Sequence, residues 1–123
     1  MSVPLFFGVV GDMGVLEIRT YRLKPDTGAA FHSTMVERCM PLLGRFGIRV
    51  LRFGPSERNE DGVEEYVLLR SFESLPARDE QEERFYGSEE WQSGPRRDIV
   101  SRIESFHTVV LTVPAEAIQA LAT

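Results

Sequence analysis

Three polar side chains alternate along residues 16–21, Leu-Glu-Ile-Arg-Thr-Tyr, which have the two-residue period of a strand. Glu17, Arg19 and Tyr21 therefore share one face of that strand. A guanidinium beside a carboxylate and a phenol can bind an anionic or enolic small molecule, because the guanidinium is a planar fork of donors. A structural role also fits, in which Glu17 and Arg19 pair with each other or across a dimer, since unpaired buried charges are very costly.

A second strand repeats this mixture of side chains. Tyr66, Leu68 and Arg70 alternate in the same way, so that they too share a face. An inner wall of aromatic, aliphatic and cationic groups suits an amphiphilic ligand. It also suits a subunit interface, where Tyr and Arg are enriched. Tyr66 and Arg70 are thus candidate ligand-binding residues or interface residues.

Aromatic residues gather in a segment with interrupted helix signals, residues 85–92 (Phe-Tyr-Gly-Ser-Glu-Glu-Trp-Gln). Phe85 and Trp91 are candidate ligand-binding residues if this segment forms the wall or lid of a pocket. The alternative is that Trp91 anchors an irregular segment to the core by burying a large ring.

The two histidines and the single cysteine offer few further sites. His107 is a candidate general base or axial haem ligand in a β-prone segment, although a structural histidine also fits there. We expect His32 to face solvent. Cys39 lies on an apolar stripe and is expected to act as a small hydrophobe. No cluster has the spacing of a zinc site, so no metal is expected, and haem is the one alternative to a cofactor-free protein. One cysteine cannot form an intramolecular disulfide, which favours a cytoplasmic location.

Composition indicates one globular domain and excludes two classes of partner. The chain has 123 residues, 42% of them hydrophobic and 27% charged. A net charge of -5 disfavours binding to nucleic acid. The apolar stretch 3–10 is far shorter than the ~20 residues of a membrane span. We place the domain at residues 14–113, with a carboxy-terminal tail at 114–123 and an extension at 1–13. Residues 1–12 are interpreted as an added edge segment or as an upstream extension from a misjudged start codon.

Periodicity predicts the order of elements that positions these residues. Phe31, Met35, Cys39 and Leu42 form a helical stripe, which should kink or end near Pro41. The segment 78–84 is almost wholly charged and is interpreted as the solvated face of a helix beginning after Ser74. The predicted elements are strands at 15–23, 48–53, 63–72 and 106–113, helices after 26 and 74, helical turns from 88 to about 103, and a helical tail at 115–122.

The order β-α-β-β-α-β is that of the ferredoxin-like α+β unit, an antiparallel sheet with both helices on one face. If Leu16 and Ile18 face the helices, Glu17, Arg19 and Tyr21 project from the open face. Each strand carries apolar residues on both sides, and leaving such a face wet costs ~25 cal/mol per Å² of apolar surface. The expected remedy is a homodimer in which two sheets pack together.

Three segments resemble the NIPSNAP family: the strand 16–21, which has the pattern Glu-x-Arg-x-Tyr, the helix end and turn 41–48 (Pro-Leu-Leu-Gly-Arg-Phe-Gly-Ile), and the aromatic segment 85–92. The resemblance covers about residues 14–112. It implies a dimeric α+β barrel in which two ferredoxin-like sheets face each other. Similar barrels host cofactor-free monooxygenases, haem-degrading enzymes, lactone isomerases and small-molecule binders, whereas NIPSNAP-like proteins have no settled activity.

Three hypotheses of function follow. The first is a dimeric small-molecule binding or accessory protein, whose cavity lies between the sheet and its helices or at the dimer seam. The second is a cofactor-independent monooxygenase or isomerase, with Arg19 for orientation, His107 or Glu17 as base and Tyr21 as hydrogen-bond donor. The third is a purely structural or interaction dimer, which requires a barrel filled by side chains.

Overall fold

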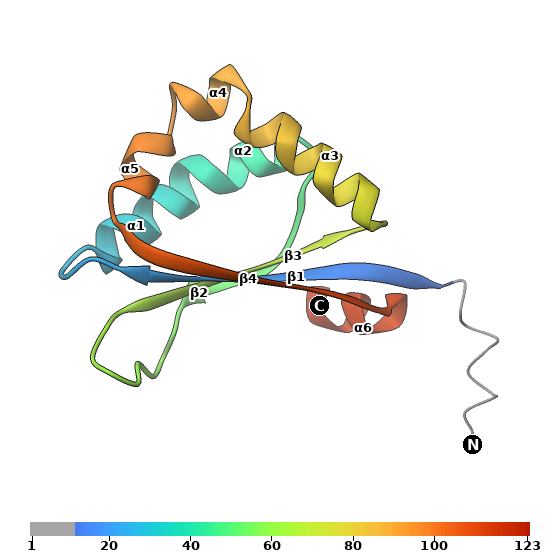
Figure 1. Ribbon diagram of the computed structural model, residues 1–123, viewed down its shortest axis with the longest axis horizontal. Coiled ribbons are helices and arrows are strands. Elements are labelled where there is room, and N and C mark those ends of the chain that lie inside the picture. Colours follow the sequence, from blue (N-terminus) through green and yellow to red (C-terminus); the bar gives the residue numbers. More distant parts are fainter. Residues whose placement is uncertain (1–11) are drawn as a thin grey trace.

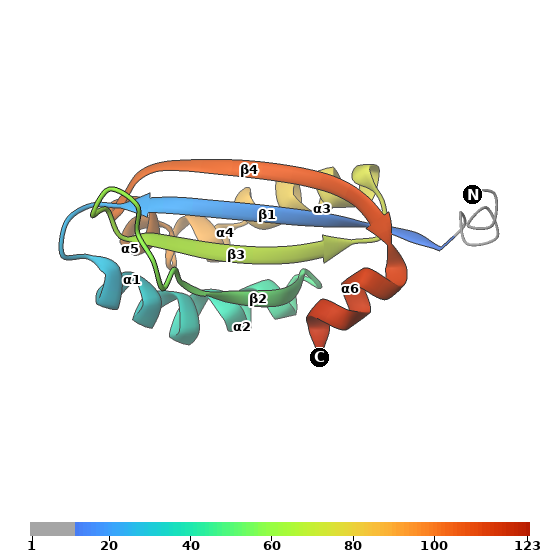
Figure 2. The ribbon, with the colours of Figure 1, turned by 90° about the horizontal axis from the view of Figure 1, so that it is seen from below.

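Residues 12–123 are described by a computed structural model, in which four antiparallel strands form one sheet (Figures 1 and 2). The order across the sheet is β2-β3-β1-β4, as expected for a ferredoxin-like α+β unit. The extension expected at residues 1–13 falls largely outside the described residues. The strands are β1 (Met13–Leu23), β2 (Arg49–Pro55), β3 (Glu65–Phe72) and β4 (Ile103–Pro114).

Helices cover one face of the sheet, and a single short helix packs on the other (Figure 1). The first arm joins α1 (Gly28–Thr34), η2 (Met35–Cys39) and α2 (Met40–Arg45), and the second joins α3 (Leu75–Tyr86), α4 (Glu89–Gln92) and α5 (Arg96–Val100). On the opposite side lies α6 (Ala115–Ala122), the helical tail predicted from the sequence.

The first helical arm continues past Pro41, where a kink or an end was expected. Proline has no N–H and crowds the preceding turn of an α-helix. Here the chain adopts a wider π-turn just before it, and the Met40 N–H donates to the carbonyl of Met35, five residues back. The predicted apolar stripe is confirmed, since Phe31, Met35, Cys39 and Leu42 are all buried.

Serine caps start α3 and α4, at the positions where a helix and helical turns were predicted to begin. The side chain of Ser74 accepts a hydrogen bond from the Ala77 N–H, and that of Ser88 accepts one from the Trp91 N–H. The prediction of helical turns to about Ile103 was too long, because α5 ends at Val100 and Ile103 already pairs with Leu23 in the sheet.

Leu16 and Ile18 of β1 do not face the helices, so the condition for placing Glu17, Arg19 and Tyr21 on the open face does not hold. Glu17, Arg19 and Tyr21 face the helices, where Tyr21 stacks near Phe31 with ring centroids 5.5 Å apart. Leu16 and Ile18 lie on the opposite face, in a cluster with Leu51 of β2 and Ile118 of α6. The cause is that α6 returns beneath the sheet and buries Leu16, whereas α3 supplies charged partners for Glu17 on the helical side.

Candidate functional site

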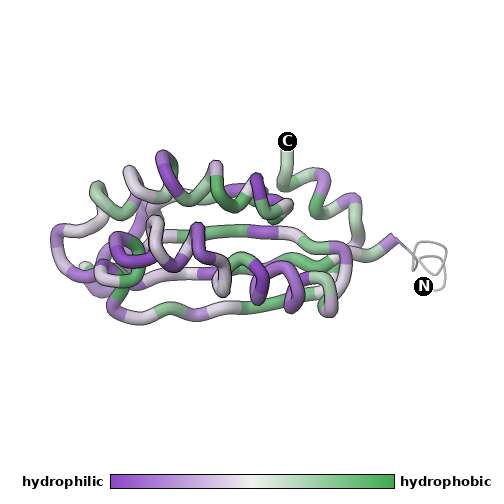
Figure 3. Tube along the Cα trace, turned by 90° about the horizontal axis from the view of Figure 1, so that it is seen from above, coloured by the Kyte–Doolittle hydropathy of each residue, from purple (hydrophilic) through white to green (hydrophobic). Residues whose placement is uncertain are grey.

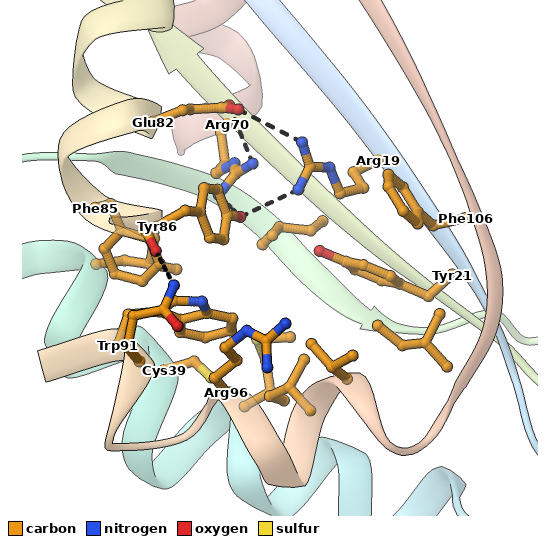
Figure 4. A pocket seen from close by; sticks show the side chains of 17 residues that line it. Arg19, Tyr21, Cys39, Arg70, Glu82, Phe85, Tyr86, Trp91, Arg96 and Phe106 are labelled. Carbon is orange, nitrogen blue, oxygen red and sulfur yellow. Dashed lines mark hydrogen bonds and ion pairs between the residues drawn. The ribbon is translucent and has the colours of Figure 1, made fainter. Parts of the chain in front are cut away.

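A cavity of about 340 Å³ lies between the sheet and the helices (Figure 4). Its exposed lining residues, Gln92, Arg96, Val100 and Phe106, mark the side that opens to solvent. Most of its wall is apolar or aromatic, and two of its polar groups, Glu82 and Tyr86, contact Arg19. The remaining lining residues are Tyr21, Met35, Cys39, Leu43, Leu68, Arg70, Glu82, Phe85, Tyr86, Trp91, Ile99 and Ile103.

A buried ion pair between Glu17 and Arg70 lies behind the polar groups near Arg19 and forms the floor of the site. Glu17 and Arg70 are directly opposite each other on β1 and β3, and both are fully buried. The Arg70 Nε donates to Glu17 Oε1 at 2.7 Å. Arg78 of α3 donates to Glu17 Oε2 from Nε at 3.0 Å and from Nη2 at 2.9 Å. Each carboxylate oxygen therefore has a charged donor, as a buried carboxylate requires.

Glu82 of α3 extends this network to the cavity wall. Its carboxyl accepts a hydrogen bond from Arg70 at 3.1 Å and forms ion pairs with Arg19 at 3.5 Å and Arg78 at 3.4 Å. Three guanidinium groups thus meet two carboxyl groups beneath α3.

The interpretation of 78–84 as a solvated face therefore needs correction, because Arg78 and Glu82 turn toward the sheet. The helix that carries them is mostly hydrophilic (Figure 3). The spacing of Arg78, Glu82, Phe85 and Tyr86 is that of a single helix face, and it was the signal that could have placed the two charges inward.

The Tyr86 hydroxyl joins the network to the cavity. It accepts hydrogen bonds from Arg19 Nη1 at 3.1 Å and from Arg70 Nη1 at 2.9 Å. Arg19 is held further by a hydrogen bond from its Nε to Thr108 Oγ1 of β4 at 3.1 Å. The guanidinium is consequently fixed by groups from β4 and α3 and directed along the cavity wall (Figure 4).

The carboxyl groups of Glu17 and Glu82 have different pKa values. Burial opposes ionisation of Glu17, but a hydrogen bond from Glu82 and the charge of Arg70 lower its pKa to about 2. Burial and the hydrogen bond with Glu17 raise the pKa of Glu82 to about 7, against the pull of Arg70. The pair therefore holds its proton on Glu82, the member that lines the cavity.

Aromatic rings form the wall next to Tyr86. Phe85 stacks edge-on with Tyr86 at a centroid distance of 4.9 Å, and Trp91 lies 5.3 Å from both rings. Trp91 is buried and anchors α4, yet it also lines the cavity, so that it combines both roles considered for it. Nearby, burial raises the pKa of the Cys39 thiol to about 12, which keeps it protonated and disfavours a nucleophilic role.

The structure separates the residues selected from the sequence into two groups. Arg19, Tyr21, Arg70, Phe85 and Trp91 line one cavity. Glu17 lies behind Arg70 and does not line it.

His107 and Tyr66 lie elsewhere. His107 is exposed on the opposite face of the sheet, paired with Thr20, so the expectation that it shares a cavity with Arg19 is wrong. Successive side chains of a strand point to opposite faces, so His107 points away from the face of Thr108, whose hydroxyl contacts Arg19. Tyr66 is buried, and its hydroxyl lies 2.6 Å from His32 Nδ1. His32 is therefore half-buried, and the expectation that it faces solvent is wrong.

Within residues 12–123, no group of three or more His, Cys, Asp or Glu residues could hold a metal ion. None of the helices in this range has the length and apolar character needed to cross a bilayer.

Comparison with known proteins identifies the family. The NIPSNAP family model matches residues 16–114, which is most of the chain. The chain belongs to the NIPSNAP family. No curated protein matches it.

Solved structures of this family have the same fold. A NIPSNAP family protein of unknown function from Agrobacterium tumefaciens superimposes with a TM-score of 0.72 at 24% identity, covering 82% of this chain and 88% of that one. An uncharacterized NIPSNAP domain protein from Burkholderia xenovorans gives 0.71 at 23%, covering 82% and 94%. A putative antibiotic biosynthesis monooxygenase from Nitrosomonas europaea gives 0.56 at 14%, covering 81% and 88%. At these identities the likeness establishes the fold and leaves the activity open.

Replacing Glu17 by glutamine tests whether the buried pair holds the site together. Glu17→Gln leaves the fully buried Arg70 without its closest counter-charge, so the free energy of unfolding in urea should fall by about 3 kcal/mol. The control is Glu65→Gln, at a half-exposed pair with Arg22, where the loss should be much smaller. Equal losses in the two variants would contradict a structural role for the network.

The raised pKa of Glu82 predicts a pH dependence of stability. Folding takes up a proton on Glu82 between its ordinary pKa of 4.5 and about 7. The stabilisation is therefore complete below pH 4.5 and is lost as the pH rises through 7. Urea unfolding at pH 5 to 8 should show this decline in the natural protein but not in Glu82→Gln. Glu83→Gln, an exposed neighbour on α3, should keep the natural profile, and a decline that persists in Glu82→Gln would assign it to another group.

Proposed function

We propose that this NIPSNAP protein is a homodimeric binding or accessory protein that holds a small organic molecule in the cavity between sheet and helices. The observation that carries the proposal is the cavity itself, with its volume of about 340 Å³. Ligand pockets of this kind are mostly apolar with a few convergent polar groups. Here Phe85 of α3 and Trp91 of α4 lie on one side of the cavity, and Arg19 and Tyr21 lie across from them (Figure 4).

The opposite face of the sheet supports the dimer. There α6 covers one end, where Leu16, Leu51 and Ile118 are buried together. Beyond it, Val109 and Leu111, the register partners of Ile18 and Leu16, expose 37% and 43% of their surface. Covering such a face with a second copy removes apolar area from water at ~25 cal/mol per Å². The cavity lies on the other side of the sheet, so this contact leaves its opening free. A cytoplasmic location is still a prediction that rests on the single cysteine.

A cofactor-independent monooxygenase or isomerase is the second candidate. The observation that favours it is Glu82, a carboxyl group that lines the cavity and has a pKa of about 7, where a general base works best. Glu82 replaces the bases first considered, since Glu17 is buried with a pKa of about 2 and His107 lies on the other face. An enzyme would return an altered ligand or consume oxygen, whereas a binding protein would return the ligand unchanged.

Blocking the mouth of the cavity tests the binding function. N-phenyl-1-naphthylamine, an uncharged fluorescent probe, should brighten on entering the aromatic cavity. Val100→Trp fills the opening from an exposed lining position, so the affinity for the probe should fall about tenfold, a change of ~1.4 kcal/mol. Leu75→Trp, at an exposed position outside the cavity, is the matched control and should bind normally. A probe that binds Val100→Trp as tightly as the natural protein would contradict binding in this cavity.

Charge on the open sheet face tests the dimer. We expect the natural protein to sediment as a dimer at micromolar concentration and Leu111→Glu to sediment as a monomer, because an unpaired carboxylate would be buried in the contact. Leu75→Glu places the same charge on α3, and that variant should stay dimeric. A natural protein that sediments as a monomer would contradict the proposed assembly.

A further inference from the structure

One buried hydroxyl at the cavity has a proton without an acceptor. Tyr21 exposes only 6% of its surface. Burial raises the pKa of its hydroxyl, and a hydrogen bond with the Arg19 guanidinium opposes this rise. Because a guanidinium can only donate, the Tyr21 proton is left without an acceptor among residues 12–123. A buried donor without an acceptor is costly, so it calls for an explanation.

The Tyr86 hydroxyl has only its proton left to offer. A hydroxyl has two acceptor positions and one donor. Both acceptor positions of Tyr86 are used by Arg19 and Arg70. Arg19 itself uses three of the five N–H donors of a guanidinium, on Thr108, Tyr86 and Glu82, and has no acceptor. Apart from the carboxyl group of Glu82, which also lines the cavity, this end presents hydrogen-bond donors.

These donors converge on one place. Figure 4 shows the Tyr21 hydroxyl directed toward the part of the cavity bordered by the Tyr86 hydroxyl and the Arg19 guanidinium. The three groups come from β1 and α3, and the contacts of Arg19 and Tyr86 with the ion network fix two of them in place.

The charge around the cavity is positive in a chain whose net charge is negative. Arg19, Arg70 and Arg78 face only two carboxyl groups, Glu17 and Glu82. Arg96 extends from α5 toward the opening (Figure 4) and forms no ion pair with a carboxylate of residues 12–123. An excess of guanidinium groups beside apolar walls favours an anion with an apolar body.

We propose that the ligand is an amphipathic carboxylic acid, whose carboxylate lies between Tyr21, Tyr86 and Arg19. Its apolar body packs against Phe85 and Trp91. The inference rests on the proposed binding function and adds the chemical class of the ligand.

Three probes of one shape and different charge test it. Phenylbutyrate, phenylbutanol and phenylbutylamine share an aromatic body and differ in the terminal group. Trp91, the single tryptophan, lines the cavity and reports binding by its fluorescence, and calorimetry confirms the affinity. Phenylbutyrate should bind at least tenfold more tightly than phenylbutanol, because hydrogen bonds to a charged acceptor are stronger, and phenylbutylamine should bind most weakly.

Two matched tyrosine variants locate the carboxylate. Tyr21→Phe should weaken phenylbutyrate binding about tenfold and phenylbutanol binding less, while the melting temperature of the free protein changes little, since the variant also removes a buried donor that has no acceptor in the protein. Tyr66 is the register partner of Tyr21, lies outside the cavity and hydrogen-bonds to His32. Tyr66→Phe should therefore lower the melting temperature and leave the affinity unchanged.

The outcomes separate the two proposals. Equal affinity for the three probes would overturn the acid preference and leave the binding function standing. The same holds if none of them binds while N-phenyl-1-naphthylamine does. Failure of all four probes would overturn the binding function together with the inference. A Tyr21→Phe variant that melts lower and keeps its preference for phenylbutyrate would show that Tyr21 is only structural.

Discussion

The ion pair between Glu17 and Arg70 is the constraint on which the helical side of this protein depends. Both residues are fully buried at facing positions of β1 and β3. Leaving either charge unpaired would cost several kcal/mol, which is a large part of the stability of a small domain. Arg78 and Glu82 complete the coordination from above, which explains why a helix as polar as α3 packs on a sheet.

The same network gives the cavity its chemistry. Arg70 and Arg19 hold the Tyr86 hydroxyl as an acceptor, and this leaves its proton for the cavity. Glu82 links the network to pH, since its pKa of about 7 means that acidification adds a proton to the wall and increases the excess of positive charge. The charged residues that stabilise the fold and those proposed to bind the ligand therefore belong to one network. A substitution of Glu17 or Arg70 alters the polar end of the cavity.

Local patterns in the sequence were enough to predict the order of the elements, the serine caps and the residues that share a face. They did not show which face of each strand packs against the helices. Alternation shows that Glu17, Arg19 and Tyr21 lie together, but β1 is apolar on both sides, and the choice depends on α6 and α3, which are distant in sequence. The error on His107 followed from the same ambiguity. Glu82 was missed because a run of charges at 78–84 conceals two inward positions.

The proposed ligand binding and the proposed dimer formation use opposite faces of the sheet. Along β1, Arg19 and Tyr21 point to the cavity, and Ile18 and Thr20 point to the side offered to a second subunit. A period of two therefore places ligand contacts and subunit contacts in alternate residues of one strand. Because the two surfaces use alternate residues of β1, the ligand contacts can change in sequence without altering the subunit contacts, and the reverse. The condition is that the Glu17–Arg70 pair keeps β1 and β3 in register.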